Sequence, residues 1–324
     1  QSARASNLSR RQNCMALLFI CDGEDPGIWE PALRAELPDL DMRIGADGIG
    51  EEADIEIALA WQPPRGLLAR LPNLKAILSL GAGVEHILRD PELPAGVPVA
   101  RLIDPGLQTG MVEFVTMEVL NHHRRAPEYH AQQRAGTWKL LRQTLSRDRR
   151  IGILGLGHLG AACGTMLARF GFPVAGWARS EKEIPGIRSF TGEDGLFSLL
   201  ERTDILICLL PLTPDTEDIL DATTLGALPR GAVLINAARG KHLVDDDLLE
   251  ALDSGQLSAA TLDVYREEPL PAGHPFWKHP NITMYPHAAA WTLPESAAPV
   301  IADNIRRAAD GRALLGQIDL RRAY

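Results

Sequence analysis

The sequence predicts an α/β protein built on doubly wound parallel sheets. Short apolar β-runs alternate with helical patterns along most of the 324 residues, and strands joined by crossover helices pair in parallel. The strongest observation is the stretch 151–160, where an apolar run stops in a glycine-spaced turn and continues as a helical pattern. A hydrophobic content of 45% is ample for a sizeable core, and this length is typical of two domains.

The glycine-spaced turn has the pattern GxGxxG, formed by Gly155, Gly157 and Gly160. In a parallel sheet that binds nucleotides, the first glycine makes a tight turn, the second lets the backbone approach a pyrophosphate, and the third lets the helix pack on the strand. The free N–H groups at the start of that helix attract phosphate. A helical pattern over 161–170 and a further strand over 173–177 follow. We therefore expect a dinucleotide-binding site at this turn.

Composition argues against several other classes of protein. The formal net charge is -9, and no basic stripe with interleaved aromatic residues marks a nucleic-acid face. No apolar run approaches the roughly 20 residues that span a bilayer. The cysteines form no CxxC pair and are interpreted as buried, reduced thiols; they are Cys14, Cys21, Cys163 and Cys208. We expect a cytoplasmic protein without a metal site.

The N-terminal part of the chain reads as a tail followed by a small α/β unit. Residues 1–14 are polar and basic without an acidic residue, and a disordered or tag-like tail is preferred to a transit peptide. Strand-like and helical segments then alternate to about residue 101. The expected strands are 16–20, 54–60 and 75–80, and the expected helices lie at 29–37 and near Leu67.

The last of these strands ends in a second glycine turn, 81–84, which leads into a short helix at 85–88. Such a turn points consecutive backbone N–H groups outward, where they can hold a carboxylate. An ordinary strand-to-helix connection is the alternative that the residues leave open.

A long helical stretch over 108–124 carries an apolar stripe and is predicted to link the domains. His122 and His123 at its end have no partners at metal-ligand spacing and are interpreted as solvated. The polar segment 135–150, with Gly136 and Trp138, has weak periodicity and is predicted to be a loop or arm.

Beyond the glycine-spaced turn the α/β alternation resumes. We expect helices at 193–200 and around Asp221 and Asp245, and strands at 204–210, 232–238 and 259–264. Ligands of doubly wound sheets bind beyond the carboxyl ends of the strands. Three segments at such ends carry unusual residues, namely 236–240, 263–270 and 285–289. The chemistry should be sought there.

These segments read NAARG, DVYREEPLP and PHAAA, and they follow GLGHLG in the order typical of the D-isomer-specific 2-hydroxyacid dehydrogenases. The chain resembles that family over nearly all of 15–324. Within it, the chain is most similar to the glyoxylate/hydroxypyruvate reductase A subgroup, through WQPP at 61–64, LGAGVEHIL, the ARGKHLVDDDLLEALDSG run and the QIDLRRAY ending.

The resemblance implies two Rossmann-like domains. A doubly wound dinucleotide-binding domain, 102–287, would be inserted into a smaller, discontinuous α/β substrate domain made of 15–101 and 288–324. The segment at about 135–150 would be the arm that wraps a partner subunit in a homodimer.

The resemblance also assigns three catalytic residues. Arg239 would hold the carbonyl and carboxylate of the substrate, since a guanidinium is always charged and presents a planar fork of donors. His287 would give a proton to the carbonyl oxygen as hydride arrives from the nicotinamide. Glu268 would accept a hydrogen bond from His287 and stabilise the imidazolium.

The expected substrate is a small 2-keto acid: glyoxylate, reduced to glycolate, or hydroxypyruvate, reduced to D-glycerate. Its carboxylate would lie on the backbone N–H groups of Gly83 and Val84 and on Arg239. Trp61 would wall the pocket and limit substrate size, and Trp138 would reach the site of the neighbouring subunit.

The cofactor is expected to be NADP(H), with NAD(H) possible. An NAD-selective unit carries Asp or Glu about 20 residues beyond the glycine turn, whereas Trp177 is here followed by Ala178, Arg179 and Ser180. Arg179 would pair with a 2′-phosphate, Ser180 would donate a hydrogen bond and Lys182 would add charge; a solvated turn with Glu181 and Glu183 is the alternative. The resemblance extends the cofactor-binding set to Gly155, Gly157, His158, Leu159, Gly160, Leu210, Pro211, Thr216, Ala237, Asp263 and Ala289.

Two rival functions stay open at this point. One is redox chemistry on another substrate, either a larger D-2-hydroxyacid with NAD or formate. Formate dehydrogenases resemble this family but pair the active-site histidine with glutamine, and Glu268 argues against that activity. The other is a non-enzymatic corepressor that senses the dinucleotide, and the lack of a long low-complexity tail speaks against it.

Overall fold

The computed structural model describes residues 16–21 and 23–320, so the predicted tail 1–14, with Cys14, lies outside the described residues. The chain divides into two compact units. Unit 1 consists of the described residues up to Leu107 and from Thr292 onward, and unit 2 runs from Gln108 to Trp291. The boundaries predicted at 101/102 and 287/288 lie a few residues from these positions. The assignment of the units to substrate and cofactor binding stays a prediction.

Unit 1 contains a five-stranded parallel sheet in the order β2-β1-β3-β4-β5. Its strands are β1 (Ala16–Cys21), β2 (Asp41–Ile44), β3 (Ile55–Trp61), β4 (Ala76–Ser79) and β5 (Val99–Ala100). Its α-helices are α2 (Pro26–Glu36), α3 (Glu85–Leu88) and α10 (Pro294–Ala309), and the helix predicted near Leu67 is a 3-10 turn, Leu68–Arg70. Strands β2 and β5 were not expected, because edge strands this short give little alternation to detect.

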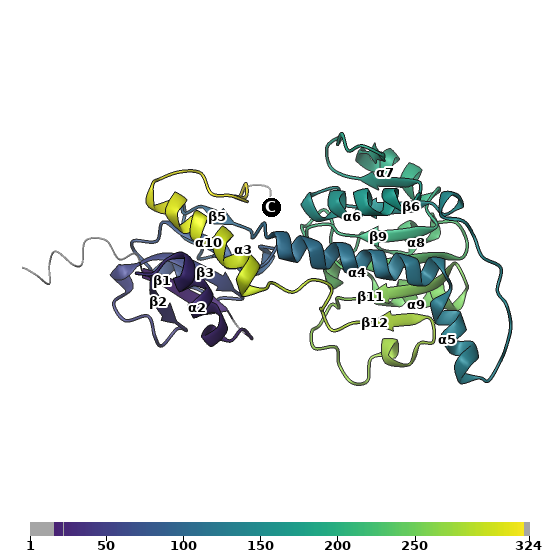
Figure 1. The fold of residues 1–324 in the computed structure, drawn as a ribbon, viewed down its shortest axis with the longest axis horizontal. Helices are drawn as coiled ribbons and strands as arrows, with labels where there is room; N and C mark the ends of the chain where they lie inside the picture. The colour runs from purple at the N-terminus through teal and green to yellow at the C-terminus, as the bar shows by residue number, and fades with distance from the viewer. Residues whose placement is uncertain (1–15, 22, 321–324) are drawn as a thin grey trace, which may run out of the picture. The chain divides into compact units, whose positions relative to one another are not determined.

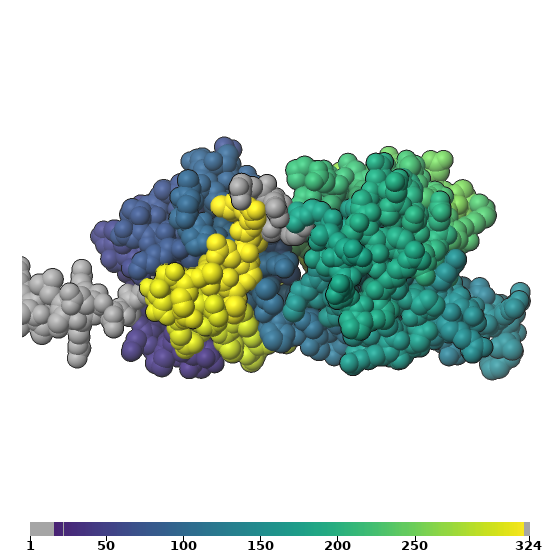
Figure 2. Space-filling view, turned by 90° about the horizontal axis from the view of Figure 1, so that it is seen from above, coloured from purple at the N-terminus to yellow at the C-terminus, as the bar shows by residue number. Residues whose placement is uncertain are grey.

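The C-terminal helix α10 completes the core of unit 1. Ile301 and Ile305 pack in one buried cluster with Trp29 and Leu33 of α2 and with Leu59 of the sheet. Figure 1 shows α10 in yellow beside the purple N-terminal strands, and Figure 2 shows its atoms lying on that segment. Helix α10 therefore belongs to unit 1, because its apolar face covers the sheet of that unit.

Unit 2 contains a seven-stranded parallel sheet in the order β12-β11-β10-β9-β6-β7-β8. Its strands are β6 (Ile151–Leu154), β7 (Val174–Trp177), β8 (Ile187–Phe190), β9 (Ile205–Cys208), β10 (Ala232–Asn236), β11 (Leu257–Leu262) and β12 (Ile282–Met284). Its helices are α4 (Pro105–His123, which starts in unit 1), α5 (Ala126–Arg134), α6 (His158–Arg169), α7 (Gly192–Leu200), α8 (Ala222–Gly226) and α9 (Asp245–Asp253). The strand order reverses between β6 and β9, so the doubly wound α/β prediction is confirmed. The edge strands β8 and β12 were not expected.

The end of α4 corrects one prediction. His122 and His123 are buried rather than solvated, because α4 packs against the sheet. The polar residues at the end of this helix do not indicate from sequence that the sheet covers them. His122 Nε2 lies 2.8 Å from the hydroxyl of Thr261, and the ring of His123 meets Phe172 edge to face with centroids 5.0 Å apart. Burial lowers the pKa of both histidines.

Two further features agree with the sequence. The segment 135–150 contains only a 3-10 turn, Ser146–Asp148, as expected of a loop or arm. Cys163 and Cys208 are buried free thiols, and burial raises the pKa of each to about 12. Cys21, at the end of β1, is also a free thiol but is only partly buried, which corrects the prediction for that residue. Within the described ranges, no helix is both long and apolar enough to cross a membrane.

Candidate active site

The glycine-spaced turn connects β6 to α6. Gly155 has φ +99°, a left-handed conformation that favours glycine, and its N–H donates to the carbonyl of Trp177 at 2.9 Å. A Cβ on Gly160 would lie 1.8 Å from the carbonyl oxygen of Gly155, whereas a Cβ on Gly157 would meet no atom within 4 Å. The first and third glycines thus close the turn, and the second leaves open space beside the first N–H groups of α6. His158 and Leu159 begin that helix.

We expect Gly160→Ala to destabilise the protein by about 1–3 kcal/mol, because the new methyl group collides with backbone rather than with a movable side chain. Thermal unfolding measures this as a fall in Tm. Gly226→Ala is the matched control, because its Cβ, at the end of α8, would meet no atom within 4 Å. Equal Tm values for the two variants would contradict the assigned packing.

The residues predicted to read a 2′-phosphate lie at the carboxyl end of β7. Ala178 is buried and its N–H donates to the carbonyl of Phe190 at 3.0 Å. Arg179, Ser180 and Lys182 are exposed, and the N–H of Lys182 donates to the Ser189 hydroxyl at 3.1 Å. The hydrogen bond between Gly155 and Trp177 places this loop next to the glycine turn. The arrangement suits an anionic group that extends from a dinucleotide.

The other predicted cofactor residues follow the carboxyl ends of the central strands. Thr216 is buried and its hydroxyl donates to the carbonyl of Pro211 at 2.7 Å, which shapes the loop after β9. The carboxylate of Asp263 accepts the N–H of Ala288 at 2.7 Å and of Ala289 at 3.0 Å. Burial raises the pKa of Asp263, although these two hydrogen bonds act to lower it. Asp263 therefore fastens the segment after β12. Leu210 and Ala237 also follow strand ends, at β9 and β10.

His287 and Glu268 form a direct pair. His287 Nδ1 lies 2.8 Å from Glu268 Oε2, with side chains 38% and 35% exposed. Glu268 Oε1 accepts the N–H of Tyr265 at 2.9 Å. Burial raises the pKa of Glu268, but the hydrogen bonds from His287 and from Tyr265 outweigh it, so the pKa is lowered overall. The carboxylate thus stays ionised at neutral pH. An Nδ1–H bound to it leaves Nε2 to exchange a proton with a ligand.

The backbone of His287 is held in an uncommon conformation, φ +55°, which non-glycine residues rarely adopt. Its N–H donates to the carbonyl of Asp263 at 2.8 Å, and the Asp263 carboxylate binds the next two N–H groups. The orientation of the imidazole is therefore set by the ends of β11 and β12 and not by local preference.

Arg239 lies in the loop after β10. A Cβ on the next residue, Gly240, would lie 1.8 Å from the carbonyl carbon of Tyr265, so this loop approaches the Glu268 loop as closely as glycine allows. The charge of Arg239 contributes to lowering the pKa of Glu268, and its Nη1 donates to the carbonyl of Ala238 at 2.7 Å. The structure thus brings Arg239, Glu268 and His287 to one edge of the sheet.

Sequence reasoning missed two supports of this loop. His242 is fully buried; its Nδ1 accepts the N–H of Arg239 at 3.3 Å, and its Nε2 lies 3.3 Å from the carbonyl of Pro211. The amide of Asn236 donates to the carbonyl of Arg239 at 3.2 Å and accepts the N–H of Ala238 at 3.2 Å. Both residues lie within the NAARGKH run, but no spacing in it signals that their side chains fold back on the loop.

The glycine turn of unit 1 is shaped by its own neighbours. The Ser79 hydroxyl donates to the carbonyl of Gly83 at 2.7 Å and accepts the N–H of Gly81 at 3.2 Å. A Cβ on Gly81 would lie 2.7 Å from the indole of Trp61, whose ring centroid is 4.2 Å from that of His86. Trp61 thus covers the turn that contains Gly83 and Val84. Trp138, by contrast, is fully exposed. The ligand roles of these residues stay predictions.

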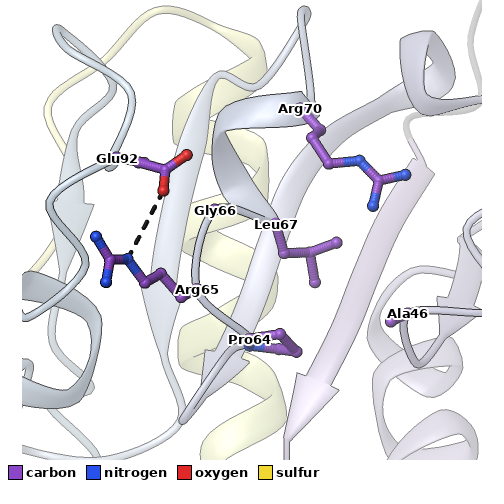
Figure 3. A pocket seen from close by; sticks show the side chains of 7 residues that line it. All are labelled: Ala46, Pro64, Arg65, Gly66, Leu67, Arg70 and Glu92. Atoms are coloured by element: carbon purple, nitrogen blue, oxygen red, sulfur yellow. Dashed lines mark ion pairs between the residues drawn. The ribbon is translucent and has the colours of Figure 1, made fainter.

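A cavity of about 360 Å³ lies elsewhere in unit 1, and none of the predicted site residues lines it (Figure 3). Its lining comprises Ala46, Pro64, Arg65, Gly66, Leu67, Arg70 and Glu92. Arg65 pairs with Glu92 at 3.7 Å, and Arg70 pairs with Glu52. Both arginines that line the cavity are therefore paired with a carboxylate. Among the described residues, no group of three or more His, Cys, Asp or Glu side chains is arranged to hold a metal ion.

Comparison with known proteins places this site in a family. Residues 116–289 match the model of the D-isomer specific 2-hydroxyacid dehydrogenase NAD binding domain. A glyoxylate/hydroxypyruvate reductase A of Yersinia enterocolitica is 44% identical over 301 residues, covering 91% of this chain and 96% of the relative.

Solved structures of other proteins are similar over nearly the whole chain. A D-isomer specific 2-hydroxyacid dehydrogenase of Xanthobacter autotrophicus Py2 in complex with NADPH and MES has a TM-score of 0.93 and 42% identity, with 96% of this chain and 100% of that chain covered. An NADPH-dependent glyoxylate/hydroxypyruvate reductase of Sinorhizobium meliloti in complex with NADP and sulfate has a TM-score of 0.89 and 37% identity, with the same coverage. The chain carries the glycine turn after β6, and Arg239, Glu268 and His287 lie at one edge of its larger sheet. It belongs to the D-isomer-specific 2-hydroxyacid dehydrogenase family and is an oxidoreductase.

Proposed function

We propose that the protein reduces small 2-keto acids, glyoxylate to glycolate and hydroxypyruvate to D-glycerate, with NADPH. The observation that carries the proposal is the His287–Glu268 pair at 2.8 Å, close to Arg239. A histidine paired with an ionised carboxylate is suited to donate a proton to a developing alkoxide. The names of the relatives from Yersinia enterocolitica and Sinorhizobium meliloti support the same substrates and cofactor.

The turn after β6 fits a dinucleotide. The open space at Gly157 and the start of α6 would hold the pyrophosphate, and Arg179 and Ser180 would bind the 2′-phosphate. When bound, NADPH supplies the hydride for the keto carbon. The remaining cofactor contacts proposed from the family resemblance are those of the strand-end loops, including Ala237 and Ala289.

The side chains then supply binding and the proton. Arg239 holds the carboxylate and polarises the carbonyl of the substrate, since its guanidinium presents several donors in one plane. His287 Nε2 gives its proton to the carbonyl oxygen, and Glu268 keeps the ring oriented through Nδ1. Gly83 and Val84 stay proposed contacts of the carboxylate, and Trp61 a proposed limit on substrate size.

Steady-state turnover of glyoxylate and hydroxypyruvate with NADPH tests the proposal. We expect saturable oxidation of NADPH that depends on the keto acid and is faster with these two acids than with longer 2-keto acids. Formate with NAD should give no reduced cofactor. If longer acids turn over faster, the substrate proposal is wrong; if no keto acid turns over, the catalytic proposal is wrong.

We expect Glu268→Gln to move the alkaline limb of the kcat/KM profile for reduction to lower pH. A neutral amide no longer stabilises the imidazolium, so His287 loses its proton at lower pH and the proton donor is depleted sooner. Glu267→Gln is the matched control. Glu267 is the exposed carboxylate next in sequence, whereas the carboxylate that meets His287 Nδ1 is that of Glu268, so this variant should leave the limb in place. An unchanged limb in Glu268→Gln would contradict the pairing.

A homodimer is part of the proposal. The arm 135–150 exposes three large apolar side chains, Trp138, Leu140 and Leu145, and exposed apolar groups of this kind are typical of interaction surfaces. In the dimer, Trp138 would reach the site of the partner subunit. A cytoplasmic location stays a prediction.

A further inference from the structure

A carboxylate that the proposed mechanism does not use is buried in unit 2. Glu118 of α4 is 1% exposed, and a buried carboxylate is costly unless its oxygens are hydrogen-bonded. Its oxygens accept the hydroxyl of Tyr285 at 2.7 Å, the hydroxyl of Thr261 at 3.0 Å and the amide of Asn121 at 3.0 Å. His122 extends the network through Thr261. Glu118 therefore ties α4 to the ends of β11 and β12.

Tyr285 is fixed in this network at its ring and at its backbone. Its ring meets Phe114 edge to face, with centroids 5.0 Å apart. Its N–H donates to the carbonyl of Leu262 and its carbonyl accepts the hydroxyl of Tyr265, both at 2.9 Å. Burial, followed by the hydrogen bond to Glu118, raises the pKa of Tyr285, so its hydroxyl stays protonated and remains a donor.

Tyr285 stands two residues before His287. The left-handed backbone of His287 has to be imposed by its surroundings. On its C-terminal side, Asp263 binds the N–H groups of Ala288 and Ala289. On its N-terminal side, Tyr285 is anchored at its carbonyl by the hydroxyl of Tyr265 and at its own hydroxyl by Glu118. The backbone of His287 is thus held from both sides, and the bond to the Tyr285 side chain comes from α4.

We propose that Glu118 and Tyr285 are positioning residues that hold His287 in hydrogen-bonding register with Glu268. The inference rests on the proposed function, in which His287 is the proton donor. Neither side chain touches the reacting atoms. Their effect on the reaction must therefore pass through His287, and this separates them from residues that only stabilise the fold.

A double-mutant cycle tests the coupling. Tyr285→Phe removes only the hydroxyl and is expected to lower kcat for glyoxylate reduction roughly five- to tenfold, the scale of one lost hydrogen bond, with little change in KM. In the His287→Ala background the same substitution should cause no further decrease in kcat. An equal loss of kcat in both backgrounds would overturn the proposal.

Variants at Glu118 extend the test. Glu118→Gln keeps an oxygen that accepts from Tyr285 and should stay close to the native kcat, whereas Glu118→Leu should match Tyr285→Phe. Thr203→Val is the stability control, because it removes a fully buried hydroxyl, bonded to the Leu199 carbonyl at 2.7 Å, just before β9 at the opposite edge of the sheet. It should lower Tm but not kcat. If kcat simply follows Tm across all four variants, the role is structural and the inference is wrong.

A measurement without turnover separates this inference from the proposed function. In protein with ¹⁵N-labelled histidine, the Nδ1 proton of His287 should resonate far downfield because it is bound to Glu268. Tyr285→Phe and Glu118→Leu should move it upfield, and Thr203→Val should not. If the native protein reduces no keto acid but this signal moves as expected, the function is wrong and the positioning stands. If the signal does not move, the positioning is wrong.

Discussion

Replacing His287 with alanine is expected to lower kcat for keto-acid reduction by roughly 10²- to 10⁴-fold, the usual contribution of a positioned general acid. The pair with Glu268 at 2.8 Å holds the ring in one orientation, and alanine leaves the developing alkoxide to take its proton from water. Binding of NADPH should be unchanged, because the residues proposed to hold its phosphates lie at the ends of β6 and β7. Single-turnover reduction of glyoxylate measures the loss.

His279→Ala is the matched control for that result. His279 also lies in unit 2 and pairs with a carboxylate, since its Nε2 lies 3.4 Å from Asp253. Asp253 ends α9, before β11 begins, so the pair belongs to the amino-terminal edge of the sheet. Its loss should leave kcat near the native value. A His287→Ala variant that turns over like this control would remove His287 from the mechanism.

The second large effect concerns the cofactor. The native protein is expected to prefer NADPH to NADH in kcat/KM, and Ala178→Asp/Arg179→Ala should shift the ratio toward NADH by roughly 10- to 150-fold. This is the range for losing one hydrogen bond to a charged group. The double variant removes the guanidinium that pairs with the 2′-phosphate and adds a carboxylate that repels it and can bind the ribose hydroxyl instead. Steady-state kinetics with both cofactors measures the ratio.

Arg169→Ala is the control for charge alone. Arg169 is an exposed arginine at the far end of α6 from the glycine turn. Its loss removes one positive charge, as Arg179→Ala does, but should leave the ratio unchanged. A native preference for NADH, or a double variant that keeps the native ratio, would show that the loop after β7 does not read the phosphate.

The sequence by itself determined the fold class and the place of the cofactor turn. Both follow from short-range rules: strands and helices have different apolar periods, and Gly155 and Gly160 occupy positions where φ +99° or a 1.8 Å approach leaves no room for a side chain. The resemblance then pointed to Arg239, Glu268 and His287. Those residues lie in three segments far apart along the chain, and no local pattern joins them.

Tertiary structure decided how those side chains meet and what holds them. The bond between His287 and Glu268 depends on a backbone conformation that the ends of β11 and β12 impose. His122 and His123 look solvated in a polar helix end, yet they are buried once the sheet covers α4. Glu118 gave no signal because its three donors come from α4, β11 and the end of β12. Burial and pairing of polar groups depend on neighbours distant in sequence, and only the folded chain brings those neighbours together.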